Sequence, residues 1–275
     1  MLDCLINGEI LEDLPVTDRG LQYGHGVFET IACDRGQPLF WNLHMLRLDA
    51  GCEALHIDPP AEDVLRREVQ TVVAGQNQAV AKIILTGGEG ERGYAMSEFP
   101  QANRIVSSYH WPVEFSANRT SGVHTRICDY RLSHSRLLAR IKHLNRLEQV
   151  LARAEWDSED IQEGILLDVE DNVIAATAGN LFLAKGGRLY TPRLDRCGIC
   201  GVMRDALMAE YIARAEKRRI SLAMLADADE VFICNSIRGI WPVTRVDKQE
   251  FPIGPLTREL QAWLTEVSPL WARPE

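Results

Sequence analysis

The 275-residue chain has no long apolar run and no excess of positive charge. A membrane-spanning helix needs about 18 or more consecutive apolar residues, and the sequence contains no such stretch. The formal net charge is −9, which argues against a nucleic-acid backbone as the main partner. The first residues, MLDCLINGEI, show no basic stretch followed by an apolar one. We therefore expect no signal peptide, no membrane and no nucleic acid.

Cysteine is sparse and irregularly spaced. The seven cysteines are odd in number and scattered along the chain, which favours a reducing cytoplasm over a disulfide framework. Cys197 and Cys200 in CGIC have the spacing of a redox or zinc motif, but no second pair or nearby histidine follows them. We therefore predict no metal site, and keep a metal or redox role for CGIC as the alternative.

Several common enzyme motifs are also missing from the sequence. It has no nucleotide P-loop, no GxGxxG after a strand and no GxSxG. The GGEGERG segment is too charged for a dinucleotide-binding turn. These absences exclude the simplest nucleotide-binding and serine-hydrolase interpretations.

Apolar periodicity predicts an α+β chain with two domains. The polar segment 112–122 is bounded by proline and glycine and is the best candidate for a linker. We predict a smaller α+β N-terminal domain over residues 1–115, a linker over 116–122, and a larger strand-rich C-terminal domain over 123–275.

Individual elements follow from the same patterns. In the N-terminal part we expect a hairpin at residues 34–37 and helices over 42–55 and 61–75. In the C-terminal part we expect a helix over about 202–217 and a strand over 220–225. A closing helix should begin near residue 256.

Another helix is predicted over about residues 144–154, with Leu144, Leu147 and Leu151 on one face. Asn145 and Glu148 form an N-x-x-E pattern that would cap its start. Lys142 lies just before this helix, where it is either an ordinary surface group or a residue placed for chemistry.

Two glycine-marked or polar loops could bind a phosphate. Gly201 leads into the helix that starts near Val202 and Met203, and free N–H groups at a helix N-terminus bind anions. Asn235 and Ser236 end a strand and could do the same. The alternatives are an ordinary loop-to-helix junction and an ordinary turn.

Other candidates are weaker on the residues alone. Arg92 and Tyr94 lie in a flexible loop that could recognise a carboxylate or could have no specific role. His25 and His44 have no partners at metal-ligand spacing, and a structural role is the safer interpretation of His44. A Schiff-base lysine near a phosphate-binding helix terminus would suggest pyridoxal phosphate, which from these residues is only a hypothesis.

Six segments, taken together, resemble a known enzyme family. They occur in the order TDRGLQYGHGVFET (17–30), HMLRL (44–48), IKHLNRLEQVLAR (141–153), GNLFLAKGGRLYTP (179–192), CGICGVMR (197–204) and ADEVFICNSIRGIWPV (228–243). The chain resembles the fold-type IV pyridoxal-phosphate enzymes, which include branched-chain and D-amino-acid aminotransferases and aminodeoxychorismate lyases. Within this family, IKHLNRLEQVLAR (141–153) and RGY (92–94) most resemble the aminodeoxychorismate lyases. The resemblance implies the two-domain α+β fold of this family and a homodimer.

The resemblance also implies roles for single residues. Lys142 would be the Schiff-base lysine and proton shuttle, and Arg47 the arginine that holds the cofactor phosphate. Backbone N–H groups of Val202 and Met203, together with Asn235 and Ser236, would bind the same phosphate. The substrate side would be formed by Tyr23, His25, Arg92 and Tyr94.

One position departs from the family pattern. Five residues before the asparagine of NLF the family has a glutamate that keeps the pyridine nitrogen protonated, and here that position is Ala175. The nearest carboxylates in sequence, Glu170 and Asp171, are expected to be exposed turn residues. Without an ionic partner for the nitrogen, the cofactor would be a poorer electron sink.

The resemblance implies a carbon–oxygen lyase of folate biosynthesis that converts 4-amino-4-deoxychorismate to 4-aminobenzoate and pyruvate. A weakened electron sink should harm a transaminase more, because the lyase product is aromatic and its formation is itself a driving force. Two alternatives stay open. One is a D- or branched-chain amino-acid aminotransferase of the same fold, and the other is a catalytically impaired member that binds the cofactor or a partner protein.

Overall fold

The computed structural model describes residues 3–10, 13–96 and 101–272. The chain divides into two compact units. Unit 1 is Met1–Pro112 with Ile141–Asn145, and unit 2 is Val113–Arg140 with Arg146–Glu275. The segment with Lys142, which we assigned to the C-terminal domain, therefore groups with unit 1. No helix in the described part of the chain has both the length and the apolar character needed to cross a membrane.

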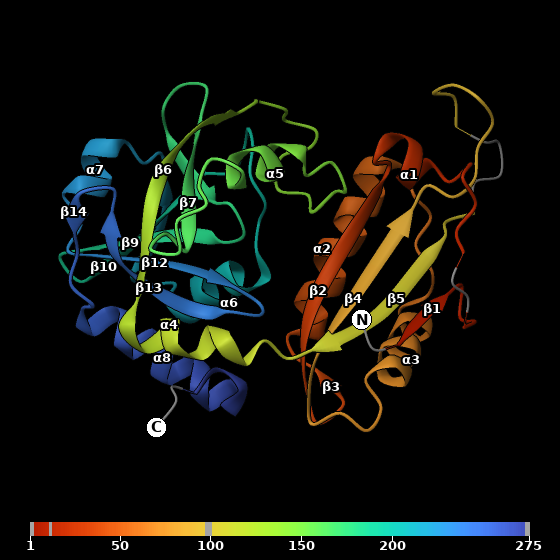
Figure 1. Cartoon of the computed structure of the whole chain (residues 1–275), viewed down its shortest axis with the longest axis horizontal. Helices are drawn as coiled ribbons and strands as arrows, with labels where there is room; N and C mark the ends of the chain where they lie inside the picture. Colours follow the sequence, from red (N-terminus) through yellow and green to blue (C-terminus); the bar gives the residue numbers. More distant parts are fainter. Residues whose placement is uncertain (1–2, 11–12, 97–100, 273–275) are drawn as a thin grey trace. The chain divides into compact units, whose positions relative to one another are not determined.

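Unit 1 is built on a five-stranded antiparallel sheet in the order β1-β5-β4-β2-β3 (Figure 1). The strands are β1 (Cys4–Ile6), β2 (Gly26–Asp34), β3 (Gln37–Pro38), β4 (Gln78–Thr86) and β5 (Arg104–His110). The predicted hairpin at residues 34–37 is confirmed, with Asp34 paired to Gln37. Arg35 and Gly36 both have positive φ, as a two-residue hairpin turn of this hand requires.

The helices of unit 1 are α1 (Arg19–Tyr23), α2 (Trp41–Leu55) and α3 (Glu62–Val72). The two longer helices confirm the predictions over 42–55 and 61–75. Their apolar faces pack with β2, β4 and β5 in one core cluster, which contains Ile31, Leu48 and Val69. Ile141 is buried in the same cluster, so the segment that follows Arg140 is anchored in this core.

Unit 2 contains a nine-stranded mixed sheet in the order β11-β10-β9-β12-β13-β6-β7-β8, with β14 paired to β13. The strands are β6 (Val123–Leu132), β7 (Glu163–Asp168), β8 (Val173–Ala176), β9 (Asn180–Lys185), β10 (Arg188–Pro192), β11 (Ala215–Arg218), β12 (Glu230–Asn235), β13 (Gly239–Val246) and β14 (Gln249–Glu250). The pairs β10–β11, β13–β6 and β6–β7 are parallel, and the other pairs are antiparallel.

The helical segments of unit 2 are η1 (Val113–Phe115), α4 (Ser116–Ser121), α5 (Leu147–Arg153), α6 (Val202–Glu210), α7 (Leu222–Ala226), α8 (Pro255–Val267) and η2 (Pro269–Trp271). The predicted linker 116–122 thus contains α4, and the closing helix is confirmed as α8.

Two predicted elements of unit 2 are wrong. The helix predicted over 202–217 ends at Glu210, and residues 215–218 form β11, which pairs with β10. Backbone pairing to an existing sheet edge overrides helical propensity there. The strand predicted over 220–225 is helix α7, which the Ser221 side chain caps by accepting a hydrogen bond from Met224 N–H.

The predicted cap of α5 is also wrong. The Asn145 amide donates to the Gly24 carbonyl at 2.9 Å, and Glu148 accepts from Ser133 N–H at 3.0 Å. Arg146 occupies the N-cap position and makes no side-chain capping bond. Both polar side chains thus bond to neighbouring loops, and neither caps the start of α5.

The expected apolar face of α5 is not buried either. Leu147, Val150 and Leu151 are exposed, and Ala152 faces the unit 2 core. Periodicity identified the helix but assigned its buried side incorrectly.

Candidate active site

Lys142 is fixed through its backbone to the first residues of β2. The Lys142 carbonyl accepts from Phe28 N–H at 3.0 Å, and Leu144 N–H donates to the Gly26 carbonyl at 2.9 Å. The Lys142 ammonium lies 4.1 Å from the centre of the Phe28 ring, within the range of a cation–π contact. A strand, and not the start of a helix, therefore holds this lysine in place.

Arg47 is held by a buried carboxylate. Its Nε and Nη2 donate to the two oxygens of Glu29 at 2.7 and 2.5 Å, which is the bidentate geometry of a strong ion pair. His44 Nδ1 lies 2.6 Å from the same carboxylate. Glu29 and His44 are fully buried, and the Arg47 side chain is 11% exposed. Glu29, which also contacts His44, thus fixes the orientation of the Arg47 guanidinium.

Burial and charge act in opposite directions in this cluster. Burial raises the pKa of Glu29, but Arg47 and His44 outweigh it and lower the pKa to about 2. Burial lowers the pKa of His44, against the attraction of Glu29, and the charges of Arg47 and Lys142 lower it further. His44 Nε2 is buried and has no hydrogen-bond partner among the described residues. Glu29 is therefore ionised near neutral pH, and the buried contact of His44 with Glu29 is consistent with a structural role for this histidine.

Three of the predicted substrate-side residues surround Arg19. Arg19 Nε donates to His25 Nδ1 at 3.1 Å, and its guanidinium lies 5.2 Å from the centre of the Tyr23 ring. Its Nη2 donates to the carbonyl of Tyr94 at 3.1 Å, and the rings of Tyr23 and Tyr94 are 5.4 Å apart. Arg92 is exposed. The structure thus brings Tyr23, His25 and Tyr94 together.

Sequence reasoning missed Arg19 and Glu29. Both are buried charged residues within the segment 17–30 that we singled out for other reasons. A charged residue inside an otherwise apolar strand pattern, as in VFETIAC, is a usable signal because such residues are almost never buried without a partner.

The N-terminus of α6 keeps its backbone donors uncapped. Its N-cap is Gly201, and no side chain caps the helix. A Cβ on Gly201 would lie 2.1 Å from Asn180 Oδ1, so only glycine fits against that amide. Val202 and Met203 are buried in the first turn. The positive end of the helix dipole and these N–H groups suit an anion such as a phosphate.

Asn235 supports the turn that follows β12. Its amide donates to the Ala178 carbonyl at 2.7 Å, and its Oδ1 accepts from the N–H groups of Ile237 and Arg238. Ser236 is buried beside it, and α6 packs against β12. The Asn235 side chain is therefore occupied by the backbone, and Ser236 is the better candidate for a ligand contact.

Ala175 lies in an apolar environment on β8. It pairs with Leu166 of β7 and is 7% exposed, within a cluster that includes Ile174 and Leu194. The position that carries a glutamate in the family pattern is thus filled by a methyl group in apolar surroundings.

The two carboxylates nearest to Ala175 in sequence are paired elsewhere. Glu170 accepts from Arg196 at 2.5 Å and from Arg219 at 3.0 Å, and Asp171 accepts from Arg131 at 2.8 Å. These arginine pairs agree with the interpretation of both carboxylates as turn residues.

The environments of the two CGIC thiols do not favour a redox pair. Burial is the main cause that raises the pKa of Cys197 to about 12 and the pKa of Cys200 above its ordinary value. Cys200 Sγ lies 4.0 Å from Arg204 Nη1, whereas Cys197 is packed in the apolar cluster of Ala175. Because the thiolate is the reactive form, these environments argue against redox chemistry.

The chain has well-defined relatives. It matches the family described as "Amino-transferase class IV" over residues 26–246. It is 36% identical to the aminodeoxychorismate lyase of Vibrio harveyi over 264 residues, which cover 93% of this chain and 97% of that protein.

Solved structures give the same picture. The crystal structure of 4-amino-4-deoxychorismate lyase from Pseudomonas aeruginosa aligns with a TM-score of 0.91 at 44% identity and covers 96% of this chain and 98% of that one. The branched-chain amino acid aminotransferase from Escherichia coli aligns with a TM-score of 0.83 at 24% identity, over 97% of this chain and 94% of that one. The second likeness is one of fold alone.

Proposed function

The chain belongs to the class IV aminotransferase family and has the α+β architecture of the fold-type IV pyridoxal-phosphate enzymes, and from this premise we propose that it is an aminodeoxychorismate lyase. The proposed reaction converts 4-amino-4-deoxychorismate to 4-aminobenzoate and pyruvate, a carbon–oxygen elimination in folate biosynthesis. The observation that carries the proposal is the near-full-length likeness to two relatives with that name, at 36% and 44% identity.

The chain offers residues of suitable chemistry for two of the three functional groups of the proposed cofactor, pyridoxal 5'-phosphate. Lys142 supplies the amine that its aldehyde needs, on backbone that β2 holds in place. For its phosphate we assign, from the family resemblance, Arg47 of unit 1 and the N–H groups of Val202 and Met203 with Ser236 of unit 2. For the third group, the pyridine nitrogen, the resemblance implies position 175, where the alanine side chain has no charge and no hydrogen-bonding atom.

Arg47 suits a phosphate because Glu29 fixes its guanidinium. The Glu29 carboxylate binds the Nε and Nη2 edge of Arg47, so the side chain is already ordered and loses little conformational entropy when it binds an anion. A fixed donor array stabilises a bound anion more than a mobile one does.

Lys142 has the chemistry required of the acid–base residue. When bound, pyridoxal phosphate withdraws electrons from the substrate carbon that carries the amino group, which acidifies its C–H bond. In the proposed reaction Lys142 Nζ would take the C4 proton, and the electron pair of that C–H bond would form a ring double bond as the C3–O bond breaks. The departing enolpyruvate takes up a proton and becomes pyruvate. Arg19, Arg92 and their neighbours would hold the two substrate carboxylates.

Ala175 favours the lyase over the aminotransferase. Loss of the carboxylate weakens the stabilisation of negative charge on the substrate carbon. Elimination is driven in addition by formation of an aromatic product, whereas transamination has no comparable driving force. The same residue is the observation that supports the second candidate, an impaired family member that binds the cofactor without efficient turnover.

We also propose that the protein acts as a cytoplasmic homodimer. The homodimer rests on the resemblance, and the exposed Leu147, Val150 and Leu151 of α5 provide apolar surface that association would bury. The seven cysteines are free thiols, as the reducing cytoplasm would keep them.

Two assays separate the candidates. A lyase releases pyruvate from aminodeoxychorismate without a keto acid, whereas an aminotransferase needs a keto acceptor and releases none. Borohydride reduction of the cofactor-loaded protein, followed by peptide mapping, should place the adduct on Lys142. An adduct without pyruvate release would support the impaired family member. An adduct on another lysine would show that Lys142 is not the Schiff-base residue.

A further inference from the structure

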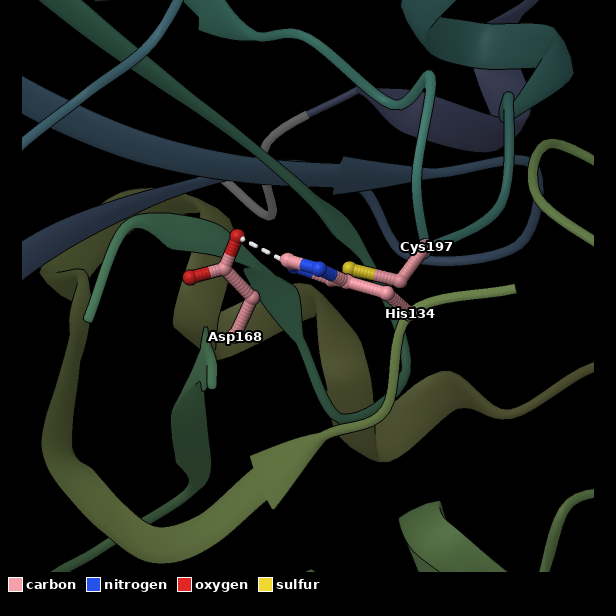
Figure 2. Close-up of side chains that lie close together, drawn as sticks. All are labelled: His134, Asp168 and Cys197. Atoms are coloured by element: carbon pink, nitrogen blue, oxygen red, sulfur yellow. Dashed lines mark hydrogen bonds and ion pairs between the residues drawn. The ribbon is translucent and has the colours of Figure 1, made fainter. Parts of the chain in front are cut away.

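His134, Asp168 and Cys197 form a cluster that the proposed reaction does not use. Their candidate ligand atoms all lie within 4.8 Å of one another. Figure 2 shows the three side chains pointing toward one another, with His134 Nε2 hydrogen-bonded to Asp168 Oδ2 at 3.0 Å. The residues come from three segments of unit 2: the loop after β6, the end of β7, and the loop between β10 and α6.

Backbone hydrogen bonds hold two of these segments together. Ser135 N–H donates to the Arg196 carbonyl at 2.8 Å, and Arg140 N–H donates to the Gly198 carbonyl at 2.8 Å. Ser135 directly follows His134 on one segment, and the two acceptors, Arg196 and Gly198, lie on either side of Cys197 on the other. The imidazole and the thiol are therefore positioned by the fold.

Asp168 is oriented by its own turn. Its Oδ1 accepts from the N–H groups of Glu170 and Asn172 at 3.0 and 2.9 Å, and from the Asn172 amide at 3.1 Å. Its Oδ2 lies 3.0 Å from His134 Nε2 and also accepts from the Asn172 amide at 3.1 Å. Outer hydrogen bonds of this kind fix a ligand carboxylate in metal sites.

We propose that His134, Asp168 and Cys197 form a binding site for a zinc-like divalent transition metal ion, with solvent as the fourth ligand. Imidazole, carboxylate and thiolate are the ligand types of Zn²⁺, and hard cations such as Mg²⁺ avoid thiolates. The proposal revises our sequence prediction of no metal site. CGIC lacked a second cysteine pair, and here a histidine and an aspartate from distant segments join Cys197.

The spacing is compatible with tetrahedral coordination. Ligand atoms at about 2.0–2.3 Å from Zn²⁺ lie roughly 3.3–3.7 Å from one another. The His134–Asp168 pair at 3.0 Å would open by a few tenths of an ångström. The thiol, within 4.8 Å of both other ligand atoms, would move inward. These are side-chain adjustments on a fixed backbone.

Of the three side chains, that of His134 is 24% exposed, whereas Asp168 and Cys197 are buried. A small surface hollow is lined by Asp168 together with Arg193, Asp195, Arg196 and Arg219. Glu170 pairs with both Arg196 and Arg219. This pairing reduces the positive charge near the hollow and weakens the case for an anion there.

Metal binding tests the proposal independently of lyase activity. The cofactor-loaded full chain, stripped of metal and kept reduced, is titrated with Co²⁺ and then with Zn²⁺. We expect one Co²⁺ per chain with a thiolate charge-transfer band in the difference spectrum, and displacement of this band by Zn²⁺. Zn²⁺ should also raise the melting temperature.

Single substitutions identify the ligands. Cys197→Ser and His134→Gln should each weaken Zn²⁺ binding by at least tenfold and abolish the zinc-dependent rise in melting temperature. Cys200→Ser, a cysteine three residues away with its Sγ near Arg204, should leave both unchanged. If Cys197→Ser does not fold, His134→Gln decides. The absence of saturable binding, or equal binding by wild type and His134→Gln, would overturn the proposal.

Discussion

Replacing Glu29 with Gln should destabilise unit 1 strongly, because this carboxylate joins Arg47 and His44 in a buried cluster. The fall of its pKa from 4.5 to about 2 corresponds to about 3 kcal/mol, at about 1.4 kcal/mol per pKa unit. Removing one partner of a buried ion pair costs about 3–5 kcal/mol. The two figures agree, and we expect a loss of about 3 kcal/mol near pH 7.

The lowered pKa of Glu29 determines how the effect of this substitution on stability changes with pH. The folded-state pKa of Glu29 is lower than the unfolded value, so its contribution is fully present above about pH 4.5 and is lost as the pH falls toward 2. The difference in unfolding free energy between wild type and Glu29→Gln should therefore be constant from pH 5 to 7 and shrink below pH 4.5.

Urea unfolding followed by tryptophan fluorescence measures the effect, since unit 1 contains Trp41 and Trp111. Asp63→Asn is the matched control, because Asp63 is 67% exposed and forms a surface ion pair with Arg67, which is 68% exposed. An exposed helix pair of this kind contributes about 0.3–0.5 kcal/mol. If Glu29→Gln lost no more stability than Asp63→Asn, the buried cluster would not have the energetic role assigned to it.

Two substitutions test other parts of the site, and a thiol-labelling experiment tests the core of unit 1. Ala175→Glu should raise lyase turnover several-fold. It should also lower the melting temperature of the cofactor-free protein, because a carboxyl must enter an apolar cluster. A fall in both turnover and melting temperature would contradict the role of this position. Gly201→Ala should weaken cofactor binding measured by absorbance titration, since its Cβ would lie 2.1 Å from Asn180 Oδ1, and unchanged affinity would remove α6 from the phosphate site. In thiol labelling of the native protein near pH 8, Cys33 should react far more slowly than the partly exposed Cys4, because burial raises the pKa of Cys33 to about 12; equal rates would contradict that environment.

The sequence predicted those features that depend on local periodicity or on an ordered set of motifs. The hairpin at residues 34–37 and helices α2, α3 and α8 follow from turn chemistry and apolar spacing. The family pattern placed Lys142 and Arg47 in segments that the structure fixes to, or packs against, β2.

Features that depend on distant partners could not be predicted in this way. Residues 215–218 form a strand because β10 offers its edge. Asn145 and Glu148 bond to other loops and do not cap α5. His134 and Asp168 are 34 positions apart in the chain, and Asp168 and Cys197 are 29 apart. No local sequence pattern signals that these three side chains come together.

The central claim is tested most directly by incubating the purified, cofactor-loaded protein with aminodeoxychorismate and quantifying both products. We predict equimolar 4-aminobenzoate and pyruvate without any keto acid. Lys142→Ala should reduce the rate by at least a thousandfold. Lys82→Ala is the matched control, because this second lysine lies 5.7 Å from the same Phe28 ring, and it should retain activity. Absence of pyruvate from the wild type, or full activity in Lys142→Ala, would contradict the account.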